Sequence, residues 1–544
     1  MTHEPSAAPR EAHPREESNA GALQFEASAP AAGFDLRRGI VPEGIFALSD
    51  GTIVAALTGL ALALRVYLSI RSYCISGDGV AYLGIAKHIA VGDFAHALAS
   101  VFPPLYPALI VTFHAIVPNW ELAADLISAI FGALTVVPIF YLFRDLLERR
   151  DLPIVAAALT AIDPELVGYS ASVRTEAGYI CLLAFAVWLA ILAIRRGRVG
   201  WAMMSGATNG IAYLYRTEAL GLALFVPGFV MLGAFVWHRW RIGWALGAAL
   251  AFCAAYLVVA SPYVVYLSRS AGHLAFSREF RAAVMYGMGD VSGDREKWQT
   301  LAYHGNPSLL APLFTAPRVF LAKFASDFAM SAYFMAEALN PLLGVLLLIG
   351  LYSRGRAIAT EWADAFLALM VLGYVAGFAI SYTGPRFMVH LIPFTFGWVA
   401  LGLVASAKWI GEALAWRRFD AAWCALAVGI VLIVIAVQND SYDVRGIRYA
   451  GEEIARITSG PRSVVTDDKR FAYYADAQQI FLPPLAAKPD LCQWLKSAPG
   501  QVYVALSDKE ESHYGVAGGA PCLVHVARYP RGEDRYYDLF KARN

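Results

Sequence analysis

Long apolar runs recur along most of the chain. About eleven of them lie between residues 52 and 437, at or near the length that crosses a bilayer. Hydrophobic residues make up 58% of the sequence and charged residues 16%, whereas roughly a quarter of a soluble domain is charged. The predicted fold class is therefore a polytopic α-helical membrane protein. The expected spans are 52–71, 122–143, 153–170, 177–194, 200–215, 219–237, 242–267, 333–352, 363–382, 387–406 and 420–437.

The apolar runs divide the chain into three parts. Residues 1–50 are rich in Ala, Pro and Glu, which predicts a disordered tail and not a cleaved signal peptide. Residues 51–437 are the expected membrane domain. From residue 438 the character changes, because β-rich segments such as 463–466 alternate with helical patches and Gly, Pro and Asp turns. The segment 438–544 therefore predicts a small soluble α/β domain.

Basic residues in the short loops set the expected orientation. They all fall on one side if the short apolar run 104–117 lies along the membrane surface and does not cross it. The positive-inside rule makes that side cytoplasmic. The N-terminus is then cytoplasmic, and the loops 72–121 and 268–332 and the C-terminal domain 438–544 face the periplasm or the cell exterior. The expected location is a bacterial inner (plasma) membrane. The basic residues are Arg144, Arg149, Arg150, Arg195, Arg196, Arg198, Arg239, Arg241, Arg354, Arg356, Lys408, Arg417 and Arg418.

The positions of the cysteines and the net charge limit the expected disulfides and partners. Cys492 and Cys522 lie in the C-terminal part and would pair only in an oxidising compartment, and spacing alone does not decide their geometry. The net charge of +1 shows no basic excess of the kind typical of nucleic-acid-binding proteins, so no nucleic acid is expected as a partner. The remaining cysteines, in or beside apolar runs, are expected to be core thiols: Cys74, Cys181, Cys253 and Cys424.

The first outward segment contains an acid between two glycines. Gly77 and Gly79 flank Asp78 just beyond the first span, and Tyr82 follows on an expected amphipathic helix. Glycine lets the backbone bend tightly around the carboxylate. A carboxylate held at the membrane surface beside apolar walls can act as a general base. The alternative is that Asp78 caps the following helix through backbone hydrogen bonds.

Two short outward turns carry the same Arg-Thr-Glu sequence. The first turn contains Arg174 and Glu176, and the second contains Arg216 and Glu218. One interpretation is a salt-bridged turn at the membrane interface, which contributes little energy. The other is that these acids face the same cavity as Asp78. The sequence leaves both interpretations open.

Further cations lie near the outer ends of spans. Arg386 and His390 are four residues apart and therefore share one helix face. Arg65 lies near the outer end of the first span, where a buried arginine costs roughly 2.5–3.5 kcal/mol unless it is paired or reaches the interface. Guanidinium groups bind phosphate oxygens bidentately. A cavity with these cations and the outward acids would bind a phosphorylated lipid and deprotonate an acceptor.

At these residues the chain resembles a known family, the C-type (GT-C) glycosyltransferases that use polyprenyl-phosphate sugars. More narrowly, it is similar to the protein-mannosyltransferase and aminoarabinose-transferase branch. The resemblance covers about 52–410. The matching parts are the Asp-x-x-x-Tyr-Leu-x-x-Ala start at Asp78, the Gly92-Asp93 step, the Pro-Pro-Leu-Tyr-Pro run at 103–107, the Arg174-Thr-Glu176 and Arg216-x-Glu218 turns, and the Arg386…His390-x-x-Pro393 segment.

The resemblance implies a mechanism. A polyprenyl-phosphate donor of a hexose or pentose enters from the bilayer, and cations hold its phosphate. The acid matching Asp78 deprotonates a hydroxyl of a lipid, glycan or protein acceptor, which attacks the anomeric carbon with inversion on the outer face of the membrane. The implied site residues are Asp78 and Glu176 for catalysis, Arg386, Arg216, Arg65 and His390 for the donor phosphate, and Tyr82, Tyr106 and Glu218 for substrate binding.

The chain also departs from the family pattern. Many relatives carry Asp-Glu in the first loop, whereas Gly79 follows Asp78 here. The second carboxylate that an acid pair or a metal site would use is therefore missing. No cofactor is assigned, and a divalent metal near His273 or His304 stays open without support from spacing.

Two other function classes remain. A transporter or flippase for lipid-linked saccharides would also need many spans and buried charge, but here the charges gather at one membrane face and not near the midplane. A non-catalytic relative could keep the fold without the acid pair. We therefore expect a glycosyltransferase and keep these two classes as alternatives.

Overall fold

The computed structural model describes residues 47–543 with gaps. Residues 1–46 of the predicted N-terminal tail, His304, Arg356, Arg417 and Arg418 lie outside the described residues, and Asp50, the last residue of that predicted tail, begins helix α2. The gaps are 73, 148, 295–296, 299, 302–310, 356, 414–420, 439–444, 483–490, 497, 517–519, 531–535 and 544.

Long apolar helices form the membrane domain. In the described part of the chain, eight helices are long and apolar enough to cross a membrane, and a bent pair gives a ninth. The other two expected spans are the helices α11 and α22, so every expected span is mostly helical and the predicted fold class is confirmed. The helices are α2 (Asp50–Arg71), α6 (Trp120–Leu134), α7 (Val136–Leu146), α8 (Asp151–Ile162), α9 (Pro164–Ser170), α10 (Glu176–Arg196), α11 (Val199–Tyr215), η1 (Thr217–Ala219), α12 (Leu220–Phe235), α13 (Ile242–Ala271), α17 (Pro317–Arg354), α18 (Ala357–Thr360), α19 (Trp362–Ile380), α20 (Pro385–Met388), α21 (Ile392–Ala413) and α22 (Ala421–Gln438).

The bent pair has a local cause. Helices α8 and α9 meet at 49° at a break after Ile162, and Pro164 has no N–H to donate to the carbonyl of Thr160 one turn earlier. Arg65 of α2 supplies donors instead, with Nη2 3.1 Å from the Thr160 oxygen and Nη1 2.8 Å from the Ala161 oxygen. An arginine in a span is thereby bonded to carbonyls that the break leaves open.

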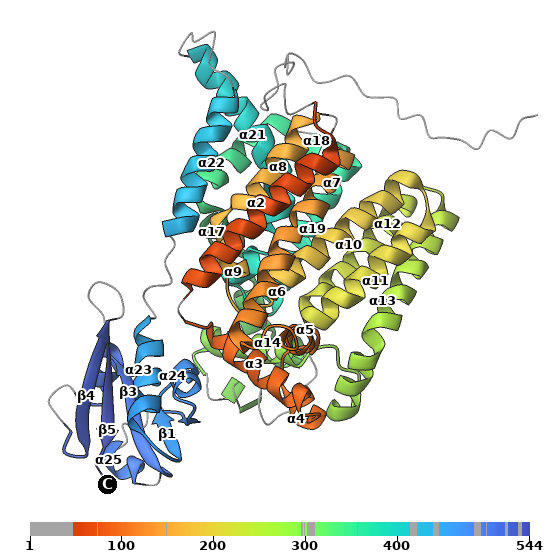
Figure 1. Cartoon of the computed structure of the whole chain (residues 1–544). Coiled ribbons are helices and arrows are strands. Elements are labelled where there is room, and N and C mark those ends of the chain that lie inside the picture. The colour runs from red at the N-terminus through yellow and green to blue at the C-terminus, as the bar shows by residue number, and fades with distance from the viewer. Residues whose placement is uncertain are drawn as a thin grey trace, which may run out of the picture. The chain divides into compact units, whose positions relative to one another are not determined.

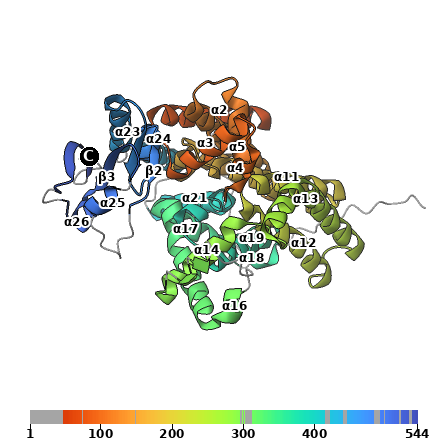
Figure 2. The ribbon, with the colours of Figure 1, turned by 90° about the horizontal axis from the view of Figure 1, so that it is seen from below.

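Short helices gather at one end of the bundle (Figure 1), and Figure 2 looks at that end. They are α3 (Gly77–Ala90), α4 (Phe94–Ala99) and α5 (Leu105–His114) between α2 and α6, and α14 (Arg278–Ser292) and α16 (Ala311–Thr315) between α13 and α17. Helix α5 has ten residues, too few to cross a bilayer, which agrees with the predicted surface helix. Helix α17 begins at Pro317, earlier than the expected 333, and it is kinked at Asn340, whose φ is 56°, just before Pro341.

The basic loops lie at the other end of the bundle, where α2 begins and where the connections α7–α8 and α12–α13 are found (Figure 1). Arg144 and Arg150 both pair with Asp50 at the start of α2, at 3.4 and 3.1 Å. Arg239 donates to the carbonyl of Thr360 at 3.0 Å. The basic loops and the short helices are therefore at opposite ends, as the charge pattern predicts, and which end is cytoplasmic remains a prediction.

The C-terminal part folds as an α/β domain around a five-stranded sheet of order β2-β1-β3-β5-β4. Strand β1 pairs in parallel with β2 and β3, and the pairs β3–β5 and β5–β4 are antiparallel. Side chains alternate between two cores: Val464 packs in the cluster with Ile447 of α23, and Val465 in the cluster with Leu491 of α25. The elements are α23 (Arg445–Ile457), β1 (Arg462–Val465), α24 (Lys469–Tyr474), β2 (Gln478–Ile480), α25 (Leu491–Leu495), β3 (Gln501–Ser507), α26 (Asp508–His513), β4 (Leu523–Pro530) and β5 (Tyr536–Ala542).

A disulfide closes the second core of this domain. Cys492 of α25 is bonded to Cys522, just before β4, with 5.5 Å between their Cα atoms. The sequence left this pairing open, because the 30 residues between the two cysteines do not fix their distance. Packing of α25 against the sheet decides it.

Candidate active site

Asp78 lies in the first turn of α3 and does not cap the helix. The N-cap is Ser76, whose hydroxyl accepts the N–H of Gly79 at 3.0 Å and donates to the carbonyl of Val173 at 2.7 Å. The capping alternative for Asp78 is therefore wrong, and its carboxylate is available for other contacts. Gly79 is required sterically, because a Cβ there would lie 2.6 Å from the Ile75 side chain.

Arg386 joins Asp78 to the first Arg-Thr-Glu turn. It stands at the start of α20, donates from Nη1 to Asp78 Oδ2 at 2.5 Å, and donates from Nε to Glu176 Oε1. Asp78 and Arg386 are each 31% exposed, whereas Glu176, the first residue of α10, is fully buried. Asp78 is therefore the solvent-accessible acid of this group, and Glu176 is the buried one.

Arg216 extends the network to the second turn. Its Nη2 and Nε donate to Glu218 Oε1 at 2.5 and 3.0 Å, and its Nη1 lies 3.4 Å from Glu176 Oε1 and 2.9 Å from Thr175 Oγ1. All three nitrogens of this guanidinium are bonded, and the residue is 5% exposed. Acids and arginines thus alternate in one continuous series of ion pairs, which we call the ion cluster. Its members are Asp78, Arg386, Glu176, Arg216 and Glu218.

Two predicted substrate residues form an aromatic wall beside the ion cluster. The hydroxyl of Tyr82 lies 3.2 Å from Thr175 Oγ1, and its ring meets the ring of Tyr106 edge to face at 5.3 Å. Tyr106 donates to the carbonyl of Ala124 at 3.2 Å. Both tyrosines are almost fully buried. In this structure they support the turn at Thr175 and expose almost no surface.

Two other predicted phosphate ligands, His390 and Arg65, are buried inside the protein. His390 is fully buried with its ring edge to face against Tyr179 at 4.9 Å. Burial and the charge of Arg216 lower the pKa of His390 to about 3, so its imidazole is neutral. Arg65 is 1% exposed and bonded to helix carbonyls, outside the ion cluster.

Glu279 belongs near the ion cluster, although no sequence motif marks it. It lies in the first turn of α14, which Ser277 caps, and the Ser277 hydroxyl is 2.9 Å from that of Thr217 in the second turn. Burial and the negative charge of Glu218 raise the pKa of Glu279 to about 7, against the opposing effect of Arg216. The only signal in the sequence was an acid within the outward loop 268–332.

A cleft of about 630 Å³ opens directly before Asp78 in the chain. Ser76, Gly77 and Arg174 line it from the membrane domain. The C-terminal domain contributes residues at the carboxyl ends of the parallel strands β1, β2 and β3, and Tyr537 of β5. Its lining residues on that side are Thr466, Asp467, Asp468, Lys469, Arg470, Phe471, Gln479, Phe481, Ser507, Glu510 and Tyr537.

Direct contacts hold the two domains together around this cleft. The Tyr474 hydroxyl accepts the backbone N–H of Ile75 at 2.7 Å. Arg448 lies 3.8 Å from Glu121 at the start of α6. The C-terminal domain is thus bonded to the segment that leads into α3, close to Asp78.

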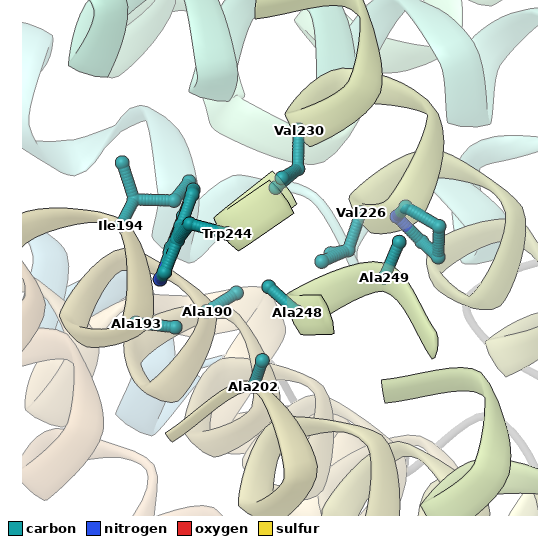
Figure 3. A pocket seen from close by; sticks show the side chains of 10 residues that line it. Ala190, Ala193, Ile194, Ala202, Val226, Val230, Trp244, Ala248 and Ala249 are labelled. Carbon is teal, nitrogen blue, oxygen red and sulfur yellow. The ribbon is translucent and has the colours of Figure 1, made fainter. Parts of the chain in front are cut away.

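A second cavity is not a candidate site. It lies between α10, α11, α12 and α13 and is lined by apolar side chains that include Ala190, Val226 and Trp244 (Figure 3). Its volume of about 10 Å³ leaves room for one water molecule at most.

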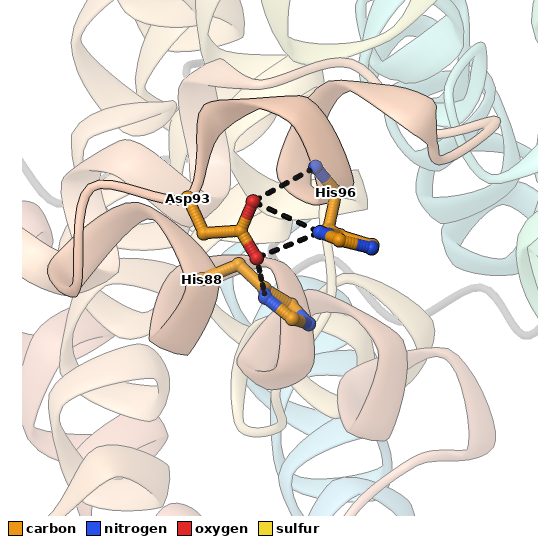
Figure 4. A group of neighbouring side chains, drawn as sticks. All are labelled: His88, Asp93 and His96. Carbon is orange, nitrogen blue, oxygen red and sulfur yellow. Dashed lines mark hydrogen bonds and ion pairs between the residues drawn. The ribbon is translucent and has the colours of Figure 1, made fainter.

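One group of side chains in the described part of the chain is close enough to hold a metal ion. It consists of His88, Asp93 and His96 at the junction of α3 and α4 (Figure 4). Neither Asp78 nor His273 belongs to it, and His304 lies outside the described residues.

Comparisons with known proteins agree with this architecture. Residues 101–266 match the family model described as dolichyl-phosphate-mannose-protein mannosyltransferase. The crystal structure of ArnT from Cupriavidus metallidurans bound to undecaprenyl phosphate is 15% identical with a TM-score of 0.51, over 90% of this chain and 98% of that one. This chain has the GT-C glycosyltransferase fold. The archaeal oligosaccharyltransferase AglB from Archaeoglobus fulgidus, in complex with an inhibitory peptide and a dolichol-phosphate, is 14% identical with a TM-score of 0.56, over 83% of this chain and 69% of that one.

The GT-C resemblance inferred from the motifs is therefore confirmed. A comparison of the sequence with curated proteins finds no match. The family-model segment contains Tyr106, Glu176 and Arg216 but not Asp78 or Arg386. Any role for the last two residues is therefore argued from the geometry of the site.

Proposed function

We propose that this protein transfers a sugar from a polyprenyl-phosphate donor to an acceptor hydroxyl at the outer face of the membrane, with Asp78 as general base. One observation carries the proposal. In a GT-C fold, the accessible acid of the ion cluster is bonded to its accessible arginine, Asp78 to Arg386 at 2.5 Å, each 31% exposed. A base and a phosphate ligand are thus in contact with each other and with solvent. ArnT and AglB, which share the fold, were solved with undecaprenyl phosphate and dolichol-phosphate.

Arg386 is the donor-phosphate ligand in this proposal. Its Nη1 and Nε are bonded to Asp78 and Glu176, and Nη2 has no hydrogen-bond partner among the described residues. A phosphate oxygen can bond at Nη2 and a second at Nη1, in the bidentate geometry that guanidinium favours. Arg216 is only 5% exposed and all of its nitrogens are bonded to protein groups, so we assign it to holding Glu176. Arg65 and neutral His390 are buried as well, and we assign them to packing.

Phosphate binding would also release the base. While Arg386 Nη1 is bonded to Asp78 Oδ2, that oxygen is occupied and is not free to accept a hydrogen bond from an acceptor hydroxyl. When the donor phosphate takes Nη1 of Arg386, Asp78 becomes available to an acceptor hydroxyl. Glu176, buried between Arg386 and Arg216, keeps both guanidiniums in place.

The transfer is then a single displacement. The acceptor O–H gives its proton to Asp78, its oxygen forms a bond to the anomeric carbon, and the bond from that carbon to the phosphate oxygen breaks. The configuration inverts because one attack occurs from the face opposite the leaving group. The departing polyprenyl phosphate gains negative charge, which Arg386 stabilises.

The acceptor would reach Asp78 through the cleft between the domains. Strand β1 pairs with β2 on one side and β3 on the other, so the carboxyl ends of β1 and β3 mark a switch point where open α/β sheets bind ligands. The cleft there continues to Gly77. The Cys492–Cys522 disulfide supports an oxidising, outward location for this domain.

The experiment is a transfer assay on protein in lipid nanodiscs. Undecaprenyl-phosphate hexoses and pentoses are supplied with lipid, glycan and peptide acceptors, and products are identified by mass spectrometry. Asp78→Asn should lose transfer, and Asp476→Asn should retain it. The control fits because Asp476 is 98% exposed and has a positive φ of 47°, a conformation that asparagine also adopts. Wild-type transfer by folded Asp78→Asn would sink the assigned base.

Orientation has its own test. A reporter enzyme that is active only in the periplasm is fused after residue 438 and, separately, after residue 413 at the end of α21. We expect activity from the first fusion and none from the second. The reverse pattern contradicts the proposed outward face.

A further inference from the structure

After α3 ends, the backbone turns back and forms hydrogen bonds with the last turn of that helix. Gly92 has a φ of +78°, its N–H donates to the Ile89 carbonyl at 3.0 Å, and the N–H of Asp93 donates to the His88 carbonyl at 2.9 Å. These two bonds define a Schellman motif, which places the residue after the glycine beside the third residue from the helix end. The backbone alone thus fixes Asp93 next to His88.

The start of α4 brings a second imidazole to the same carboxylate. Asp93 is the N-cap of α4 and accepts the N–H of His96 at 3.3 Å. The ring Nδ1 of His96 lies 2.9 and 2.8 Å from the two carboxylate oxygens, and the ring Nδ1 of His88 lies 3.0 Å from Oδ2. Figure 4 shows both rings turned toward Asp93.

We infer that His88, Asp93 and His96 bind a divalent transition-metal ion, with Zn²⁺ as the best fit. Their ligand atoms all lie within 4.8 Å of one another. Bonds of about 2.0–2.1 Å in a tetrahedral zinc site separate ligand atoms by about 3.3 Å. The hydrogen-bonded separations of 2.8–3.0 Å therefore need to open by only a small amount.

Donor chemistry and exposure define the class of ion. Two imidazole nitrogens and one carboxylate suit Zn²⁺ and its neighbours, whereas Mg²⁺ and Ca²⁺ prefer oxygen ligands throughout. The side chains of His88, Asp93 and His96 are 48%, 33% and 74% exposed. A water molecule can therefore complete the coordination without any rearrangement of the protein.

The metal would position the surface helices and take no part in the transfer itself. The site closes the opposite end of α3 from Asp78. Arg278, which precedes Glu279, donates from Nη1 to the carbonyls of Leu98 and Ala99 at 3.0 Å, so the end of α4 is tied to α14. A metal at the α3–α4 junction would fix α4 against α3, whose first turn carries Asp78. The far end of α4 is bonded in turn to Arg278 at the start of α14. The inference does not depend on the proposed function.

The test is direct metal binding to the full chain in nanodiscs, purified with a histidine-free tag and stripped with a chelator. Isothermal titration with ZnCl₂ and elemental analysis after dialysis should give one Zn²⁺ per chain, and Mg²⁺ in millimolar excess should not displace it. His88→Gln and His96→Gln should each weaken binding at least tenfold, and His513→Gln in α26 should not. Co²⁺ should give the visible absorption of a four-coordinate site.

Asp93→Asn separates the metal from the helix cap. Asparagine caps helices about as well as aspartate but lacks the charge. Zn²⁺ should raise the melting temperature of the wild type and not of Asp93→Asn, while the two chelated proteins melt alike. Absence of stoichiometric Zn²⁺ in the folded wild type overturns the inference, and so does uptake that persists in the His88→Gln/His96→Gln double variant.

Discussion

Arg65 and Arg386 are both charged residues set among apolar helices, and their partners differ. Arg65 is 1% exposed, and its guanidinium is bonded to the backbone carbonyls of Ala61, Thr160 and Ala161. Arg386 is 31% exposed and bonded to the carboxylates of Asp78 and Glu176. Neutral carbonyls at a helix break hold the first arginine, and charged side chains hold the second.

The difference separates a structural arginine from one that can exchange partners. Pro164 has no N–H for the Thr160 carbonyl, so Arg65 replaces a backbone donor there, and its loss would leave that buried oxygen without the bond. An anionic ligand can replace a carboxylate at Arg386 and offer the same kind of bond. Sequence patterns assigned both residues to donor phosphate, and the contacts favour Arg386 alone.

The largest effect is expected at the base that Arg386 holds. Asp78→Asn should reduce transfer by about 10²- to 10⁴-fold, the usual contribution of a general base. The same change frees Arg386 Nη1, so undecaprenyl phosphate should bind no more weakly than to the wild type. Initial rates and lipid-binding titrations measure the two effects. Weaker lipid binding together with lost transfer would mean that Asp78 builds the phosphate site and does not act as base.

The second prediction tests directly whether Arg65 and Arg386 differ in their contribution to phosphate binding. Arg386→Ala should weaken undecaprenyl-phosphate binding by about 10- to 100-fold, because hydrogen bonds to charged groups contribute about 1.5–3 kcal/mol. Arg65→Met, the matched change in the other arginine, should leave that affinity unchanged. Titrations in nanodiscs are to be compared at equal folded fraction. Equal losses in the two variants would restore Arg65 to the phosphate site.

The third prediction concerns Arg65 itself. Arg65→Met should destabilise the protein by about 1–3 kcal/mol, because two buried carbonyls lose their donors. In a Pro164→Ala background the cost should be smaller, since the new N–H can serve Thr160. Thermal unfolding of the four proteins of this double-mutant cycle gives the coupling. Additive effects would show that Arg65 and the break at Pro164 act independently.

The smallest effect is a pH dependence from Glu279. Its pKa of about 7 lies above the ordinary value for glutamate, so the carboxyl is largely neutral below pH 7 and negative above it. Ionisation adds negative charge near Arg216 and Arg386. Affinity for a donor phosphodiester, whose own charge is constant over this range, should fall a few-fold between pH 6 and pH 8, and Glu279→Gln should remove the slope. A slope that survives in Glu279→Gln belongs to another group.

Much of the architecture could be predicted because each membrane span is encoded by consecutive residues. Each span needs about twenty apolar residues in sequence, so composition reveals it without knowledge of its neighbours. The outward acids and arginines could be grouped in the same way, because span counting sets which loops share a side. That grouping brought Asp78, Glu176, Arg216, Glu218 and Arg386 to one cavity together with Arg65. The structure places the first five in one ion cluster and Arg65 outside it.

Roles within that group could not be predicted, because they depend on burial. Glu176 and Asp78 are both loop acids in the sequence, yet one is fully buried and the other 31% exposed. His390 shares a face with Arg386 by spacing, but burial makes its imidazole neutral. Glu279 carries no motif and gains its significance from the approach of α14 to Glu218.

The sequence by itself determined that this chain fills a membrane with helices, carries basic loops at one end and acids and arginines at the other, and ends in an α/β domain. Hydrophobicity and charge are properties of single residues, so their patterns can be recognised along the sequence without knowledge of the fold. Only the tertiary structure decided which arginine faces carboxylates and which faces carbonyls. That choice depends on how α2 packs against the break between α8 and α9 and how α20 meets α3, contacts between segments that are distant in sequence.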